Sequence, residues 1–283
     1  MSRRSLFSLI SLSVLLGLGT APAQAEQSIP GRSSVTAPVK FTAHDYGFDG
    51  PDHIPAGTTT LQLVNRGHDL HQIQLLRLRK GKTAEDFRTA LLATGGQLPD
   101  WIKYVGGPNA IVPGEESAAT MNLVEGEYLL ICLIPNKDGV PHVALGMQKP
   151  LSVKGGKPSL VSEPKAGITI TQTDYRFALS APLTAGSHTI RVMNQGKQPH
   201  EVVVVKLNPG VSAKEFAEGV ELNPSAPPPG LPIGGVVGVE QGEHAYFTTR
   251  FEPGRYGLIC FFPDPATGKA HFMQGMSTEF TVR

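Results

Sequence analysis

A strong excess of charge of either sign is missing from this 283-residue sequence. It has 25 basic and 24 acidic residues, and without the arginines at positions 3 and 4 the basic total falls to 23. Proteins that bind nucleic acid or an anionic membrane surface usually carry a marked excess of positive charge. The composition therefore gives no reason to expect a nucleic acid partner.

Long apolar runs are also missing, except for one near the N-terminus. Arg3 and Arg4 precede an apolar run over residues 6–18, and small residues follow as far as Ala25. This order is typical of a signal peptide, whereas a membrane anchor needs about 20 apolar residues. We expect residues 1–25 to be removed and the mature protein to be periplasmic or secreted by a bacterium, with no membrane span. The general secretory route and the twin-arginine route both stay open.

Cysteine is scarce, because Cys132 and Cys260 are the only two. In an oxidising compartment two cysteines form a disulfide by default, and buried apolar cysteines are a second ordinary alternative. Glycine and proline, by contrast, are plentiful, at 32 and 24 residues. This abundance favours many short strands joined by turn-rich loops over a helical bundle.

The second part of the sequence repeats the first at an offset of 129 residues, which changes to 128 around the second cysteine. The matching segments are Asp45–Phe48 and Asp174–Phe177, Asn65–Gly67 and Asn194–Gly196, and Tyr128–Cys132 and Tyr256–Cys260. A repeated unit of this length is a domain rather than a solenoid repeat. We predict a first copy over residues 33–155, a linker over residues 156–165 and a second copy over residues 166–283.

Within each copy the apolar residues mostly alternate with polar ones, which is typical of half-buried strands. Thr83 and Ser212 are good N-caps for one short helix in each copy, with Phe87 or Phe216 pointing inward. Residues 223–232 are rich in proline and predict a loop. Each copy is thus expected to be a small β-sandwich with one helical insertion.

Both copies carry the same order of metal-binding residue types. A His follows the Asn-x-Gly turn and opens a strand, and some sixty residues later a strand ends in Cys. The loop after the Cys returns a second His and, five residues later, a Met. The residues are His71, Cys132, His142 and Met147 in the first copy, and His200, Cys260, His271 and Met276 in the second.

This order resembles the cupredoxins, the family of plastocyanin and azurin, across both copies. The resemblance implies an all-β fold of two tandem Greek-key β-sandwiches, with these eight residues holding one type 1 copper in each. Two imidazoles, a thiolate and a weak axial thioether suit both Cu(I) and Cu(II), so rearrangement on electron transfer is small.

Two features depart from the family pattern. Nine residues separate Cys132 from His142, and ten separate Cys260 from His271, where small cupredoxins have two to four. The longer loop either folds back and delivers its His or holds it away from the Cys. The residue after the first His, often an Asn in the family, is Gln72 in one copy and Glu201 in the other.

Four functions are compatible with this pattern. The leading hypothesis is an exported electron carrier with a periplasmic redox or copper-handling protein as partner, and copper carriage would use the same ligands. A copper oxidase is less favoured, because coupled sites need His-x-His pairs and a His next to the Cys, and neither is present. A metal-free module could instead bind a partner through exposed Phe261, Phe262 and Pro263. His68, three residues before His71, is expected to be turn surface rather than a ligand.

Overall fold

The structure is a computed structural model that describes residues 37–155, 162–224 and 226–283. The predicted signal peptide lies outside these residues, as do residues 156–161 of the predicted linker. None of the helices in the described ranges combines the length and the apolar character that a membrane-spanning helix needs.

Over its described residues, 37–155, the first copy contains nine strands, one α-helix and one 3-10 helix. In chain order they are β1 (Val39–His44), β2 (Gly47–Asp49), β3 (His53–Ile54), β4 (Gly57–Asn65), β5 (Gln74–Leu78), α1 (Ala84–Ala93), β6 (Ile102–Gly106), β7 (Glu116–Leu123), β8 (Gly126–Ile131), η1 (His142–Leu145) and β9 (Gln148–Val153).

The second copy repeats this order with eight strands. They are β10 (Ile168–Thr173), β11 (Arg176–Leu179), β12 (Gly186–Asn194), β13 (His200–Leu207), α2 (Ala213–Leu222), β14 (Gly230–Val239), β15 (His244–Phe251), β16 (Gly254–Ile259), η2 (His271–Gln274) and β17 (Ser277–Val282). The expected loop over residues 223–232 is shorter than predicted, because β14 begins at Gly230 and pairs with β13.

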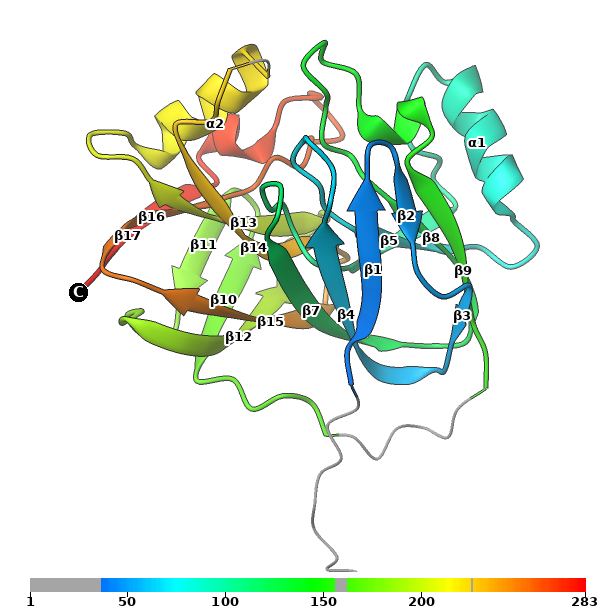
Figure 1. Ribbon diagram of the computed structural model, residues 1–283, viewed down its shortest axis with the longest axis horizontal. Coiled ribbons are helices and arrows are strands. Elements are labelled where there is room, and N and C mark those ends of the chain that lie inside the picture. The colour runs from blue at the N-terminus through cyan, green and yellow to red at the C-terminus, as the bar shows by residue number, and fades with distance from the viewer. Residues whose placement is uncertain (1–36, 156–161, 225) are drawn as a thin grey trace, which may run out of the picture. The chain divides into compact units, whose positions relative to one another are not determined.

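The strands form two sheets, and each sheet takes strands from both copies (Figure 1). One has the order β11-β10-β12-β15-β7-β4-β1-β2, and the other β17-β16-β13-β14-β6-β5-β8-β9-β3. The strands of each copy stay together, and strands of different copies pair where β15 meets β7 and where β14 meets β6. The predicted all-β fold is confirmed, while the exact domain boundaries stay a prediction.

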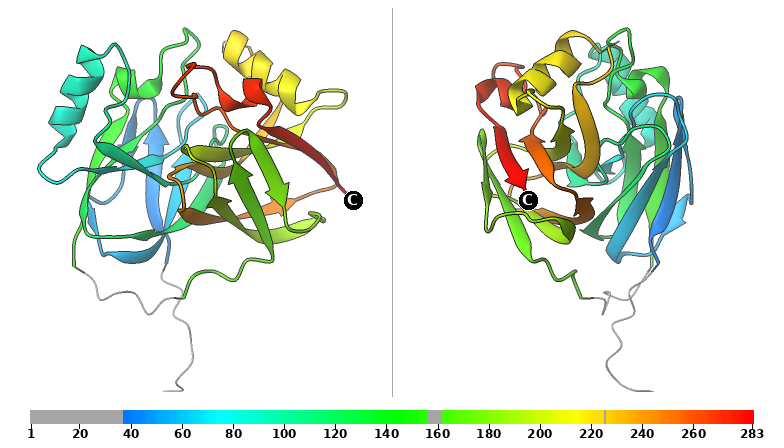
Figure 2. Two further views of the ribbon diagram at one scale, coloured as in Figure 1. Left: turned by 180° about the vertical axis from the view of Figure 1, so that it is seen from behind. Right: turned by 60° about the vertical axis from the view of Figure 1, so that its left-hand side comes forward.

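The two helices cover the outside of the second sheet, each with one aromatic side chain. Thr83 and Ser212 are the N-caps, and each forms a capping box with the acidic residue three positions later. Phe87 and Phe216 are almost completely buried, which stabilises each helix by about 1.5–3 kcal/mol through apolar burial. Figure 2 shows α2 beside η2 and β17, so this helix lies over the end of the sheet from which the second Cys comes.

Candidate metal centres

The structure brings one Cys and two His together in each copy. His71, Cys132 and His142 form the first site, and their possible ligand atoms lie within 4.8 Å of one another. His200, Cys260 and His271 form the second site in the same way. All six side chains are fully buried, and both cysteines are free, so the default disulfide is not formed.

In the first site both imidazoles turn the same ring nitrogen toward the thiol. Cys132 Sγ lies 3.4 Å from Nδ1 of His142 and 3.9 Å from Nδ1 of His71. Cys132 directly follows β8, His71 lies just before β5, and His142 opens η1, so three separate segments deliver the three groups.

The second site repeats this arrangement with closer imidazoles. Cys260 Sγ lies 3.5 Å from His271 Nδ1, and the Nδ1 atoms of His200 and His271 are 3.0 Å apart. The backbone N–H of Glu201 donates to Cys260 Sγ at 3.5 Å. One nitrogen of each imidazole and the thiol sulfur thus lie within 4.8 Å of one another in this site as well.

The long loop between Cys and His folds back in both copies. His142 N–H donates to the carbonyl of Ile134, and Val143 N–H donates to the carbonyl of Cys132. The second copy makes the same bonds one loop residue later, from His271 to Phe262 and from Phe272 to Cys260. Because these bonds close the loop at its base, the extra residues form a small excursion and do not move the His away.

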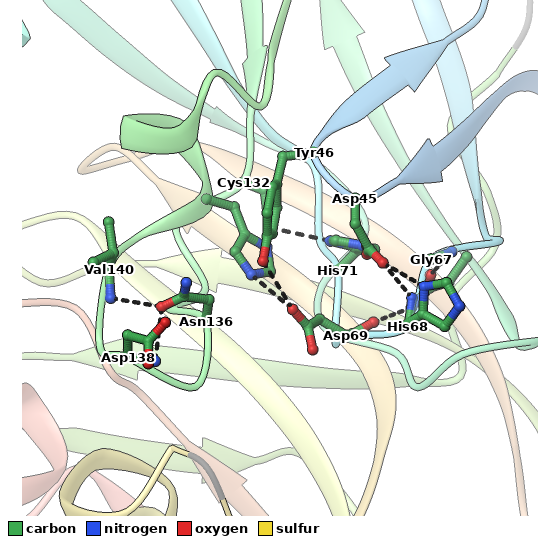
Figure 3. Close-up of polar contacts among 12 residues, drawn as sticks. Asp45, Tyr46, Gly67, His68, Asp69, His71, Cys132, Asn136, Asp138 and Val140 are labelled. Atoms are coloured by element: carbon green, nitrogen blue, oxygen red, sulfur yellow. Dashed lines mark hydrogen bonds and ion pairs between the residues drawn. The ribbon is translucent and has the colours of Figure 1, made fainter.

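A polar side chain holds each excursion in shape. Asn136 Oδ1 accepts hydrogen bonds from the backbone N–H groups of Asp138 and Val140 (Figure 3). Asp264 occupies the equivalent place in the second copy and accepts from the N–H groups of Ala266 and Thr267. Such Asx turns stabilise a loop without help from the rest of the protein.

The backbone of each methionine is hydrogen-bonded to the backbone of the cysteine of its site. Met147 and Met276 are fully buried and directly follow the glycines that end η1 and η2. Cys132 N–H donates to the carbonyl of Met147, and Cys260 N–H donates to the carbonyl of Met276. A role for their sulfur atoms as axial ligands stays a prediction.

Two aspartates that we did not single out from the sequence hold the first His of each site. Asp45 Oδ1 lies 2.7 Å from His71 Nε2, and Asp174 Oδ1 lies 3.0 Å from His200 Nε2. A bond to Nε2 leaves Nδ1 free to act as the ligand atom. The repeated Asp-Tyr-x-Phe motif was the available signal, because a polar residue that returns in both copies needs a reason. His68 also contacts Asp45 but is 97% exposed and lies outside the candidate ligand group, as expected (Figure 3).

The glycine of each Asn-x-Gly turn makes room for this Asp–His contact. A Cβ atom on Gly67 would lie 2.2 Å from Asp45 Oδ1 and 2.4 Å from His71 Nε2. On Gly196 it would lie 2.5 Å from both corresponding atoms. The preceding asparagine closes the turn, since Asn65 Oδ1 accepts from Gly67 N–H.

A tyrosine covers the second His of each site. The ring of Tyr46 lies 4.7 Å from that of His142, and the ring of Tyr175 lies 5.3 Å from that of His271. Their hydroxyls donate to carboxylates, Tyr46 to Asp69 in the first copy. In the second copy the acceptor is Asp264, from the Cys-to-His loop.

The two sites therefore differ in what faces Nε2 of the second His. In the first site the nearby group is the carboxylate of Asp69, whose Oδ2 lies 3.7 Å from His142 Nε2. In the second site an amide takes its place, because Gln198 Oε1 lies 3.0 Å from His271 Nε2.

The electrostatics of both sites favour a bound cation. Burial lowers the pKa of His142 and of His271 to about 4, so both imidazoles are neutral and able to bind a metal at pH 7. Burial also raises the pKa of the Cys132 thiol to about 12 and raises that of Cys260. A thiolate at these positions needs a positive charge beside it, which a metal ion supplies.

Asp45 lies at the solvent-exposed edge of the first site and is ionised. Burial opposes its ionisation, but hydrogen bonds from His68 and His71 outweigh that effect and lower its pKa to about 2. A soft sulfur donor and two neutral imidazoles, backed by a carboxylate, fit copper by donor chemistry.

One sequence expectation about the second loop is wrong. Phe262 was expected to be exposed, but it is 8% exposed and lies edge-on to Tyr104 of the first copy, with ring centroids 4.9 Å apart. Pro263 is exposed, and Phe261 is half-buried. An aromatic residue in a loop was assigned to the surface because the sequence does not show that the other copy packs against it.

No protein-family model matches the sequence, and no curated protein matches it significantly. Solved structures similar to this chain include a reduced auracyanin from Roseiflexus castenholzii, which is 18% identical over 41% of this chain and 94% of that chain, with a TM-score of 0.28. Auracyanin A, a blue copper protein from Chloroflexus aurantiacus, is 23% identical over 42% and 100%, with a TM-score of 0.28. A blue copper oxidase from Nitrosomonas europaea is 13% identical over 86% and 85%, with a TM-score of 0.25.

Support for metal binding comes from the geometry of the side chains and not from these likenesses. The chain is an all-β protein that resembles the cupredoxins, with one group of two His and one Cys in each copy of its repeat.

Proposed function

We propose that this protein binds one copper ion in each copy, in type 1-like sites, and works as an exported electron carrier with a periplasmic redox partner. The observation that carries the proposal is the convergence of one thiol and two imidazoles in each copy, within 4.8 Å. Bound copper would supply a one-electron couple, for which this ligand set is suited.

Burial of the ligands supports electron transfer over copper carriage. All six side chains are inaccessible to solvent, and three of the four imidazoles have an Nε2 partner, namely Asp45, Asp174 or Gln198. Side chains held in this way change little when the metal changes its oxidation state. Exchange of copper with a partner would instead require the ligands to be reached from outside.

The test is to add Cu(II) to metal-free protein purified from periplasmic material. We expect two copper ions per chain and an intense visible absorption from thiolate-to-copper charge transfer. The intact mass should be that of a chain that starts at Glu26. Cys132→Ser and Cys260→Ser should each lose one copper and about half of the absorption, because each removes the only thiol of one site.

His53→Ala is the control, since this exposed histidine lies on β3 and belongs to neither candidate ligand group. It should leave the copper content unchanged. The proposal fails if the wild-type protein takes up no copper at stoichiometric levels, and a metal-free binding module would then be the better account.

A further inference from the structure

The second site is held in part by a side chain of the first copy. Asn109 follows β6, is fully buried, and reaches across to β13 and β14. Its Nδ2 donates to Glu201 Oε2 at 3.1 Å, and to the carbonyls of Val202 and Val236 at 3.2 Å each. Its own Oδ1 accepts from Ala110 N–H, so every polar atom of the side chain is used.

Glu201 connects this contact to the thiol of the second site. Its backbone N–H donates to Cys260 Sγ, and its side-chain Oε1 accepts from the N–H of Phe261, the residue after the Cys. Glu201 is only 6% exposed. Among the described contacts, Asn109 is the one side chain that donates to its carboxyl group. Loss of that donor would leave a buried carboxyl oxygen without a partner, which is costly.

Among the residues that the structure describes, no corresponding side-chain connection from the second copy reaches the Cys132 loop. Gly107 and Gly235 correspond in the repeat and share a positive φ, of 136° and 119°. Counting two residues onward, Asn109 corresponds to Val237, which has no hydrogen-bond donor in its side chain. The residue that corresponds to Glu201 is Gln72, which is neutral. The link across the copies therefore runs in one direction, from the first copy to the second site.

A second contact from the first copy reaches Phe262, two residues after Cys260. Phe262 packs edge-on against Tyr104 of the first copy, as described above. It fits there because Gly238 has no side chain, since a Cβ at that position would lie 2.3 Å from the Phe262 ring. The first copy thus contacts the residues next to Cys260 twice, at Glu201 through Asn109 and at Phe262 through Tyr104.

We propose that Asn109 is a positioning residue for the second site, which it completes from the first copy by holding Glu201 against the Cys260 loop. This inference rests on the proposed metal binding only for its spectroscopic test. The first copy would then be required for the properties of the second site, whereas the first site is built within its own copy.

The test uses Asn109→Ala in two backgrounds that isolate the sites. Cys132→Ser leaves the second thiol only, and Cys260→Ser leaves the first. In the Cys132→Ser background, Asn109→Ala should shift the energy of the thiolate-to-copper absorption band and the reduction potential of the bound copper. In the Cys260→Ser background it should leave both unchanged.

A second readout needs no metal. In metal-free Cys132→Ser protein, Asn109→Ala should raise the rate at which Cys260 reacts with a thiol reagent about tenfold, the factor that corresponds to one lost hydrogen bond of this kind. The reaction of Cys132 in the Cys260→Ser background should not change. If copper does not bind but this rate rises, the positioning role stands and only the proposed function fails.

Val237→Ala is the matched control, because it truncates the corresponding side chain of the second copy and removes no hydrogen bond. It should change neither site's spectrum nor the Cys260 rate. Asn109→Ala should also have no further effect on that rate in a Glu201→Leu background, because Glu201 is the mediator. Unchanged behaviour of the second site in Asn109→Ala, or equal changes in both sites, would overturn the proposal.

Discussion

At the scale of single residues, the repeated glycine of the Asn-x-Gly turn shows how packing shapes the site. Gly67 lies so close to the contact between Asp45 and His71 that no side chain fits beside it. The sequence shows this glycine as part of a turn, but not that it borders a candidate ligand. Its importance comes from a contact with Asp45, 22 positions earlier in the chain.

We expect Gly67→Ala to weaken copper binding at the first site about 10- to 100-fold, the usual effect of losing a residue that orients a metal ligand. The added methyl group would separate Asp45 from His71 and let the imidazole turn. Competition with a copper chelator in the Cys260→Ser background measures this affinity. Gly47→Ala is the control, since a Cβ there meets nothing within 4 Å. Equal copper affinities for both variants would show that the contact between Asp45 and His71 does not orient the imidazole for copper binding.

The convergence of two His and one Cys in each copy could be predicted because their types and order return in both copies. The residues behind them could not be assigned a role in the same way. Asp45 was visible as part of a repeated motif, but only the fold places it against His71. Asp69 was harder still to recognise from the sequence, because the second copy has Gln198 at the corresponding position and the residue is therefore not repeated.

At the scale of elements, the loop between Cys and His was the one part of the site that the sequence left undecided. Its length allowed two outcomes, and the choice depends on backbone bonds that close the base of the loop. Strands and helices were easier, because alternation and N-caps are local. Thr83 and Ser212 start their helices where those rules place them.

Asp264 makes the stability of the second loop dependent on pH. Hydrogen bonds, first from Tyr175 and then from Thr267 and Gln198, hold the pKa of this buried carboxyl well below its usual value. A pKa that is lower in the folded state stabilises the protein above the unfolded value of about 3.9. That contribution is lost as the pH falls below this value and through the folded pKa.

We therefore expect Asp264→Asn to lower the free energy of unfolding of the metal-free protein at pH 7, because it replaces an acceptor by a donor opposite Gln198. The difference from wild type should shrink as the pH is lowered below about 4. Urea unfolding at a series of pH values measures both. Asp138→Asn, at an exposed place in the first loop, should have little effect at any pH. A difference for Asp264→Asn that stays constant with pH would contradict the linkage.

At the scale of the whole molecule, the two copies share more than the repeat predicts. Both sheets run from one copy into the other, and a single buried apolar cluster includes Leu63 of the first copy and Val192 of the second. The sequence could indicate two units but not their junction. Pairing between β7 and β15 depends on edges that carry no local pattern, and the buried Phe262 reflects the same limit.

Shared sheets and a shared core predict that the two copies unfold together. Trp101, the only tryptophan, reports on the first copy, and labelling of Cys260 in a Cys132→Ser background reports on the second.

Leu61→Ala, at a fully buried position in β4, should lower the free energy of unfolding by about 2–5 kcal/mol. Because the change lies in the first copy, independent copies would shift only the Trp101 transition. We expect the urea midpoints of both probes to fall by the same amount, and Leu92→Ala, on the exposed face of α1, to move neither. A Cys260 midpoint that stays in place while the Trp101 midpoint falls would mean that the paired edges contribute too little to make the copies cooperative.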